Sequence, residues 1–217
     1  MRKPWQVIRE KFEADPPLWA IRLMVGRLLL ELKGSMLGVA LSSPKLCLGP
    51  GSVVIGARYI SFGSRVRAKS SLRLDAMPRG HDKTFKPLLT IEEGVAFSDG
   101  VHISSGEHVR VGSNTLMGSH IYISDYNYGT TDGSQPGLCR QAPVRREPDG
   151  GGPVIIGQNV WIGDNVIILG PANIGDGAII GANSVVRGDI PAATMAAGTP
   201  AAIFKQFRPA TGRWERV

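Results

Sequence analysis

The sequence predicts a mainly β protein in which short strands and turns wind into a repeating coil. From Ile156 onward an aliphatic residue returns at every sixth position, through Ile162 and Ile168 as far as Val186. Glycine, asparagine and aspartate recur between these positions, which disfavours helix and supplies a turn in every unit. Aromatic residues make up only 6% of the chain while apolar residues make up 42%, so we expect an aliphatic core.

The six-residue spacing does not follow a helix face, on which apolar residues return after three or four positions. Four positions after each large aliphatic residue comes a small or branched one; these are Val160, Val166, Ala172, Ala178, Ser184 and Ile190. Such units stack their inward side chains in columns, and each coil hydrogen-bonds to the next about 4.8 Å away. Looser forms of the repeat begin near Val53 and at Ile91, and the register slips by two residues at "HVRVG".

The chain divides into a helical segment at 1–40, a coil domain at 41–206 and a tail at 207–217. Within the first segment the predicted helix has a wide apolar face, made of Leu18, Trp19, Val25, Leu28, Leu29 and Leu32. Arg22 and Arg27 interrupt this segment, so no charge-free run approaches the roughly 20 residues of a membrane span. We expect no signal peptide, and the apolar face either packs on the domain or contacts a membrane surface.

The chain is basic, with a formal net charge of +7, and therefore suits an anionic partner such as nucleic acid, a membrane surface or a phosphorylated cofactor. It contains no nucleic-acid-binding motif, which disfavours the first of these. Cys47 and Cys139 lie far apart and match no metal-ligand spacing, so we expect a reducing cytoplasm rather than a disulfide framework.

The repeat is interrupted twice, by loops that we expect at 75–88 and 124–153. A coil accepts insertions at its corners because the stacked strands are left undisturbed. The second interruption begins with "SDYNYG" and is rich in glycine, proline, aspartate and arginine.

Four stretches resemble the hexapeptide-repeat acyltransferases: "VRVGSNTLMGSHIYIS", "GPVIIGQNVWIGDNVIILG", "IGDGAIIGANSVVRGDIP" and "AAGTPAAIFK". The sequence is most similar to sugar O-acetyltransferases, including the maltose and galactoside enzymes and those that modify capsule and O-antigen polysaccharides. This resemblance implies a left-handed parallel β-helix with eighteen residues per turn. It also implies a homotrimer whose active sites lie between neighbouring subunits. The basic, apolar N-terminal helix would suit work at the cytoplasmic, inner face of the membrane. The implied reaction transfers an acetyl group from acetyl-CoA to a sugar hydroxyl of a cell-surface polysaccharide, such as lipopolysaccharide, or of its precursor.

The expected catalytic base is replaced in this chain. The polysaccharide O-acetyltransferases usually carry "SDHNHG", whereas here Tyr126 and Tyr128 stand in place of both histidines, and a tyrosine is a poor base at neutral pH. Asp125, which precedes them, is expected to orient an acceptor hydroxyl or to tune Tyr126. His102, in "SDGVHI", is the leading substitute base, with a purely structural role as the open alternative.

The "SDGVHI" stretch resembles the family's "NDNVHI", which faces the acceptor. We therefore assign Ser98, Asp99 and His120 to acceptor binding, although His120 also suits a solvent-facing turn. His102, His108 and His120 are separated by multiples of six, a spacing that suggests a zinc site of the kind found in related carbonic anhydrases. The register slip takes these histidines out of alignment, so we expect no metal.

The resemblance also assigns residues to coenzyme A. It places the pantetheine arm along a groove beside "NVWIGDN" and the coils that follow, and it places a basic residue beyond "GTPA" at the nucleotide phosphates. The residues assigned to the cofactor are Trp161, Gly163, Asp164, Ala182, Ser184, Arg187, Gly188 and Lys205.

Two other function classes remain open from the sequence. The double tyrosine replacement also fits a hexapeptide-repeat protein that has lost its chemistry and acts as a binding or scaffold subunit. A metal-dependent hydratase is the third and weakest reading.

Overall fold

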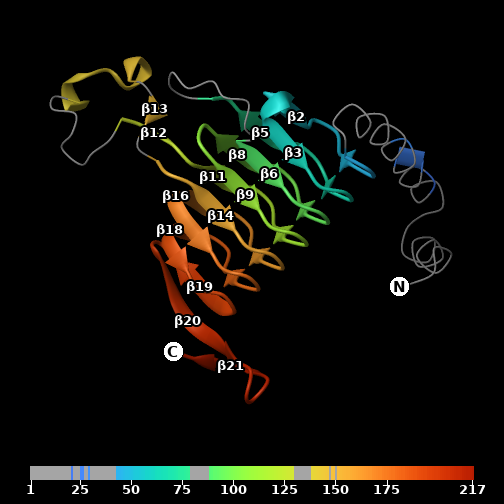
Figure 1. Cartoon of the computed structure of the whole chain (residues 1–217), viewed down its shortest axis with the longest axis vertical. Coiled ribbons are helices and arrows are strands. Elements are labelled where there is room, and N and C mark those ends of the chain that lie inside the picture. The colour runs from blue at the N-terminus through green and yellow to red at the C-terminus, as the bar shows by residue number, and fades with distance from the viewer. Residues whose placement is uncertain are drawn as a thin grey trace.

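The computed structural model describes residues 43–78, 88–129, 138–146, 148–149 and 151–217, together with Ile21, Val25, Gly26 and Leu29. Over these ranges the chain winds into stacked coils of short strands, from β1 at one end to the C-terminal strands at the other (Figure 1). Paired residues in the regular coils are 18 apart in sequence, as in Ile167 and Val185. The predicted coil of parallel strands is confirmed.

The strands form three faces of a prism. The first face is a nine-stranded sheet with the order β1 (Cys47–Leu48), β4 (Arg67–Ala68), β7 (Ala96–Phe97), β10 (Leu116–Met117), β15 (Trp161–Ile162), β17 (Ile179–Ile180), β19 (Thr194–Gly198), β20 (Ala201–Arg208) and β21 (Arg213–Arg216). Its strands run parallel as far as β19, and then β20 and β21 add antiparallel to it.

The ten-stranded sheet supplies the other two faces, which we call limb one and limb two. Limb one contains β2 (Val53–Ile55), β5 (Arg73–Ala76), β8 (His102–Ser105) and β11 (Tyr122–Ser124). Limb two contains β3 (Ile60–Phe62), β6 (Leu89–Ile91), β9 (Val109–Val111) and β14 (Val154–Ile156). The long strands β16 (Ile167–Ile174) and β18 (Val185–Ile190) cross from one limb to the other and join them.

The core consists of the columns of inward side chains that the six-residue repeat predicts. Ile156, Ile162, Ile168, Ile174 and Val186 are all fully buried. Neighbouring coils pair like with like, so that Ile162 lies opposite Ile180 and Ile168 lies opposite Val186. Burying each large aliphatic side chain contributes roughly 1.5–3 kcal/mol.

Two of the three corners are tight turns with one residue in the left-handed region in each coil. Corner 1 joins limb two to the nine-stranded sheet through Arg65, Gly94, Asn114, Asn159, Gly177 and Ala193. Corner 2 joins the nine-stranded sheet to limb one through Gly51, Ser71, Gly100, His120, Asn165 and Asn183. The backbone N–H of each such residue, from the second coil on, donates to a carbonyl one coil earlier, as Asn165 donates to Ser119 at 2.8 Å. Asparagine is common here because it tolerates positive φ better than other non-glycine residues.

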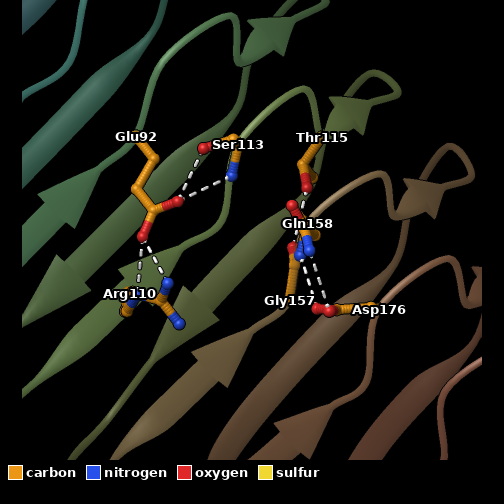
Figure 2. A network of polar contacts seen from close by, with 7 residues as sticks. All are labelled: Glu92, Arg110, Ser113, Thr115, Gly157, Gln158 and Asp176. Carbon is orange, nitrogen blue, oxygen red and sulfur yellow. Dashed lines mark hydrogen bonds and ion pairs between the residues drawn. The ribbon is translucent and has the colours of Figure 1, made fainter.

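Polar side chains beside corner 1 reinforce this stacking (Figure 2). Glu92 accepts from the Nε of Arg110 at 2.7 Å, and from both the hydroxyl and the backbone N–H of Ser113, at 2.7 and 3.0 Å. Two coils further on, Asp176 accepts from the backbone N–H of Gln158 at 2.9 Å. These bonds tie each turn to the next coil.

Corner 3 lies between limb one and limb two. Where a coil has more than 18 residues, the additional ones are at this corner. It holds the 3₁₀ turn η1 (Ala57–Tyr59), residues 77–88, residues 106–108 and the long segment 125–153. Within the last of these, β12 (Asn127–Tyr128) pairs antiparallel with β13 (Pro148–Asp149), and two further 3₁₀ turns, η2 (Leu138–Arg140) and η3 (Pro143–Arg145), lie between them. Strands β12 and β13 stand out from the prism at the upper left of Figure 1.

The ends of the chain differ in how far the structure describes them. The predicted tail begins inside β20, and residues 213–216 form β21, so this part of the chain makes a hairpin in which Phe207 packs against Trp214. The predicted N-terminal helix lies outside the described residues except for Ile21, Val25, Gly26 and Leu29, which are helical and exposed. The helix as a whole stays a prediction. Within the described part of the chain, no helix has the length and apolar character to cross a membrane.

Candidate active site

The polar residues of interest gather on the outer surface of limb one, between corner 2 and corner 3. Side chains alternate along each strand, so that Leu74, Ile103 and Ile123 point into the core. The neighbours of these residues point outward, and the pairing of β5, β8 and β11 places them in two rows. The first row is Arg73, His102 and Tyr122, and the second is Asp75, Ser104 and Ser124.

His102 is held from two sides. Its Nε2 lies 3.0 Å from Oδ2 of Asp75, on the neighbouring strand. Its ring packs edge-on against that of Tyr122, with centroids 5.2 Å apart and planes at 62°. The side chain of His102 remains 35% exposed, so a bound molecule can reach it.

Tyr126 reaches back from corner 3 over the same surface. Its hydroxyl lies 2.7 Å from the hydroxyl of Ser104, which is two residues beyond His102 on β8. Tyr128 packs edge-on against Tyr126, with centroids 6.2 Å apart, and is exposed. The structure therefore brings the two tyrosines to the same face as His102.

Asp125 lies on the inner side of corner 3 instead. Its carboxylate is fully buried and accepts four hydrogen bonds, from the Ser105 hydroxyl and from the backbone N–H groups of Gly106, Glu107 and His108, at 2.7–2.9 Å. These bonds hold the turn at 106–108 that adds two residues to its coil. We had expected Asp125 to orient an acceptor or to tune Tyr126, whereas its contacts are those of a structural anchor.

The residues predicted to bind the acceptor sit at corner 2, just before His102. The Ser70 hydroxyl donates to Oδ1 of Asp99 at 2.5 Å, and the backbone N–H of His120 donates to the carbonyl of Asp99 at 2.8 Å. His120 occupies the left-handed turn position of its coil and is exposed, while Ser98 is half-buried.

Three of the eight residues assigned to coenzyme A continue the outer side of the same corner in later coils. Gly163 and Asp164 lie at corner 2, and Oδ1 of Asp164 accepts from the backbone N–H of Ser119 at 2.6 Å. Ala182 lies at the equivalent position of the next coil, because the N–H of Asn183 donates to the carbonyl of Asp164. Trp161, two residues before Gly163, projects from the nine-stranded sheet and is 54% exposed.

The remaining assigned residues do not line the outer side of corner 2. Ser184 is buried, where its hydroxyl donates to the carbonyl of Gly181 and accepts from the N–H of Gly198. Arg187 and Gly188 belong to the part of β18 that rounds corner 3. Lys205 lies on β20 opposite Met195, at the C-terminal end of the nine-stranded sheet. Within one subunit, Trp161 thus lies next to the corner 2 residues, whereas Arg187 lies at a different corner of the prism.

The histidines form no metal site in the part of the chain that the structure describes, where no group of three or more potential ligands lies close enough to hold an ion. His102 is on limb one and His120 is at corner 2. His108 lies in the turn at corner 3 that surrounds Asp125.

The sequence did not reveal three residues of this site, namely Asp75, Ser104 and Tyr122. Asp75 was placed in the loop at 75–88, whereas the structure places Asp75 and Ala76 on β5. The usable signal was the alternation in "RLDA", where Leu74 is apolar and both of its neighbours are charged, as in a half-buried strand.

Comparisons with known proteins identify the class. The family model described as bacterial transferase hexapeptide (six repeats) matches residues 153–188. WbbJ of Escherichia coli (strain K12), to which O-acetyl transfer in lipopolysaccharide biosynthesis is ascribed, is 40% identical over 158 residues, or 73% of this chain and 77% of WbbJ. The chain therefore belongs to the hexapeptide-repeat acyltransferases, and its β-helix is the left-handed one of that family.

Two other similarities have narrower scope. A 2,3,4,5-tetrahydropyridine-2,6-dicarboxylate N-acetyltransferase of Staphylococcus aureus is 48% identical over 60 residues, which are 28% of this chain and 25% of that enzyme. The solved structure of a mutant of AntD, an N-acyltransferase from Bacillus cereus, in complex with dTDP-4-amino-4,6-dideoxyglucose and coenzyme A, superposes with a TM-score of 0.59 at 16% identity. That match covers 82% of this chain and 91% of AntD, and it supports the fold alone.

Proposed function

We propose that the protein transfers an acetyl group from acetyl-CoA to a hydroxyl of a sugar in a cell-surface polysaccharide, such as lipopolysaccharide, or in its precursor. Its family membership and its similarity to WbbJ support this reaction class. The observation that carries the proposal is the surface of limb one. There a solvent-accessible histidine contacts a carboxylate and lies beside two hydroxyl groups, those of Ser104 and Tyr126.

His102 is the general base of this proposal. It takes the proton from the acceptor hydroxyl while the oxygen attacks the thioester carbon, the C–S bond breaks, and the coenzyme A thiolate takes up the proton from His102. Asp99, Ser98 and His120, at the adjoining corner, contact the acceptor. Tyr126 and Tyr128 border the acceptor on the opposite side, at corner 3.

The pantetheine arm runs along corner 2 in this proposal. At that corner Gly163 and Asp164 lie two coils beyond Asp99, and Ala182 lies one coil further, so an arm laid along them delivers the thioester toward His102. Trp161 flanks the arm, and Lys205 meets the phosphates. Arg187 and Gly188 contact the cofactor from a neighbouring subunit.

A homotrimer would allow Arg187 and Gly188 of one subunit to contact the cofactor bound to its neighbour. The outer surface of the nine-stranded sheet carries an unbroken apolar row, formed by Ala96, Leu116, Trp161, Ile179 and Met195. Leu116 and Trp161 are about half exposed, and exposed apolar rows of this kind mark interaction surfaces. We propose that this row packs against another subunit and that the enzyme works in the cytoplasm. Contact of residues 1–40 with the inner membrane face stays a prediction, because that segment lies almost wholly outside the described residues.

The test is an acetyl-transfer assay against a panel of sugars, with His102→Gln as the key variant. We expect His102→Gln to lower kcat by on the order of 10² to 10⁴, the usual contribution of a positioned general base. Trp161→Ala should instead raise the KM for acetyl-CoA with little change in kcat. If no sugar accepts an acetyl group while coenzyme A still binds, the protein is instead a binding or scaffold subunit without catalytic activity. If His102→Gln is fully active, His102 is not the base.

A further inference from the structure

The carboxylate beside His102 comes from a strand that the sequence did not connect with the site. Across the β5–β8 pair, Arg73 lies opposite His102 and Asp75 lies opposite Ser104, so Asp75 is the diagonal neighbour of His102. Side chains of diagonal neighbours are within reach when they are long or aromatic. The 3.0 Å separation of Asp75 Oδ2 and His102 Nε2 is a hydrogen-bond distance.

This contact determines which ring nitrogen carries the proton. An ionised carboxylate only accepts hydrogen bonds, so Nε2 of His102 must donate and must hold the proton. Nδ1 is then the unprotonated nitrogen, the one that is able to take a proton from a substrate. When it does so, the ring becomes positively charged and the carboxylate stabilises that charge.

We propose that Asp75 is a positioning residue for His102: it fixes the imidazole tautomer and orientation and stabilises the imidazolium formed during transfer. This inference rests on the proposed function, in which His102 is the base. The hydrogen-bond partners of Asp75 among the described residues are His102 and Arg73, so in this role Asp75 acts through His102.

The surroundings of Asp75 favour this role over that of a surface ion pair. Arg73 Nε also donates to Oδ2, at 2.8 Å, but Arg73 is half exposed, and an exposed ion pair contributes little to stability. The other oxygen, Oδ1, is buried, and no donor among the described residues bonds to it. A buried acceptor without a bond is costly, and such atoms call for an explanation beyond stability.

Four groups lie near His102 on β8 and on the strands beside it; two of them, Asp75 and Tyr122, contact its ring. Arg73 and Asp75 come from β5, Tyr122 comes from β11, and the Ser104–Tyr126 hydroxyl pair lies two residues along β8. Of these, Asp75 is the one anionic group, and Arg73 partly offsets its charge. Arg73→Gln is therefore the matched control, because it removes the other partner of the same carboxylate oxygen and leaves the contact with His102 in place.

The experiment compares wild type with Asp75→Ala, Asp75→Glu and Arg73→Gln by two measurements. In steady-state kinetics we expect Asp75→Ala to lower kcat by on the order of 10- to 10³-fold with the KM for acetyl-CoA unchanged. Asp75→Glu should restore part of the loss, and Arg73→Gln should stay within about threefold of wild type. In NMR spectra of protein with ¹⁵N-labelled histidine, the proton on Nε2 should be visible in wild type and Arg73→Gln. It should be lost to solvent exchange in Asp75→Ala.

The outcomes separate this inference from the function on which it rests. Wild-type kcat in Asp75→Ala, together with an inactive His102→Gln, overturns the inference and leaves the proposed function standing. Survival of the Nε2 proton signal in Asp75→Ala also overturns it. If the protein transfers no acetyl group at all, the proposed function fails, and the NMR measurement still decides whether Asp75 holds the ring. Should Asp75→Ala fail to fold, Asp75→Leu, which is close to aspartate in size and has no acceptor, takes its place in both measurements.

Discussion

The buried carboxylate of Asp125 gives the sharpest test of how the coil carries its insertions. Replacing Asp125 with Ala removes the acceptor for one hydroxyl and for the backbone N–H groups of residues 106–108. Gly106 is buried, so its N–H loses its partner without gaining water. We expect the turn at 106–108 to separate from corner 3 and the free energy of unfolding to fall.

The magnitude follows from the bonds lost. A hydrogen bond to a charged group contributes about 1.5–3 kcal/mol, and an unsatisfied buried donor costs a further 1–3 kcal/mol. These terms overlap, and the turn relaxes toward water, so we expect a net loss of about 3–5 kcal/mol rather than the full sum. Asp125→Asn should cost nearly as much, because its amide group presents donors to a site already full of donors.

The assay is urea unfolding at a fixed protein concentration, which keeps any contribution from oligomerisation constant. Asp164→Ala is the control, because its carboxylate is exposed and Oδ1 accepts a single backbone N–H, that of Ser119. We expect this control to cost less than about 1 kcal/mol. Equal losses in the two variants would refute the anchor role. Unchanged stability with lost transfer in Asp125→Asn would instead return Asp125 to catalysis.

Two further predictions concern the surface of the prism. The Ser113 hydroxyl, together with Arg110, lowers the pKa of Glu92 below its ordinary value of 4.5 (Figure 2). The stability that this carboxylate adds is therefore present above about pH 4.5 and is lost as the pH falls through the lowered pKa. The difference in unfolding free energy between wild type and Glu92→Gln should accordingly shrink as the pH falls below 4.5. Light scattering should report a trimer for the wild-type protein and a smaller species for Leu116→Asp, because this substitution places a charge in the apolar row between subunits. A wild-type monomer at micromolar concentration would contradict the proposal that neighbouring subunits share the cofactor site.

The core could be predicted from the sequence because a six-residue period determines which side chains point inward. Every sixth residue from Ile156 to Val186 is buried, and so is every member of the second set from Val160 to Ile190. The two-residue slip at "HVRVG" was visible as well, since it displaces that period. Its cause was not, because the bonds from residues 105–108 to Asp125 span 17 to 20 positions and leave no local pattern.

The site was predictable only in part, because one of its contacts also depends on residues that are far apart in the sequence. His102, Tyr126 and Tyr128 stand in motifs that resemble those of the family, so their positions could be assigned. Asp75 could not be paired with His102, because Arg73 and His102 are paired across 29 residues instead of 18, and the difference is the loop at corner 3. The length of such a loop says nothing about which residues face each other across it. Only the structure establishes that register.

The corners explain why the polar groups collect on limb one. At corners 1 and 2 each coil needs a left-handed residue whose N–H donates to the preceding coil, so an insertion there breaks the column of bonds. Among the residues that the structure describes, corner 3 carries no such column, and the chain segments that join its strands differ greatly in length. The outer surface of limb one lies between a fixed corner and a variable one. The path that we propose for the cofactor arm, along corner 2, therefore lies across limb one from the loops of variable length. In this chain a tyrosine stands at the usual position of the base, on the variable side. The histidine and its aspartate lie on the strands themselves, where the register between coils fixes their separation.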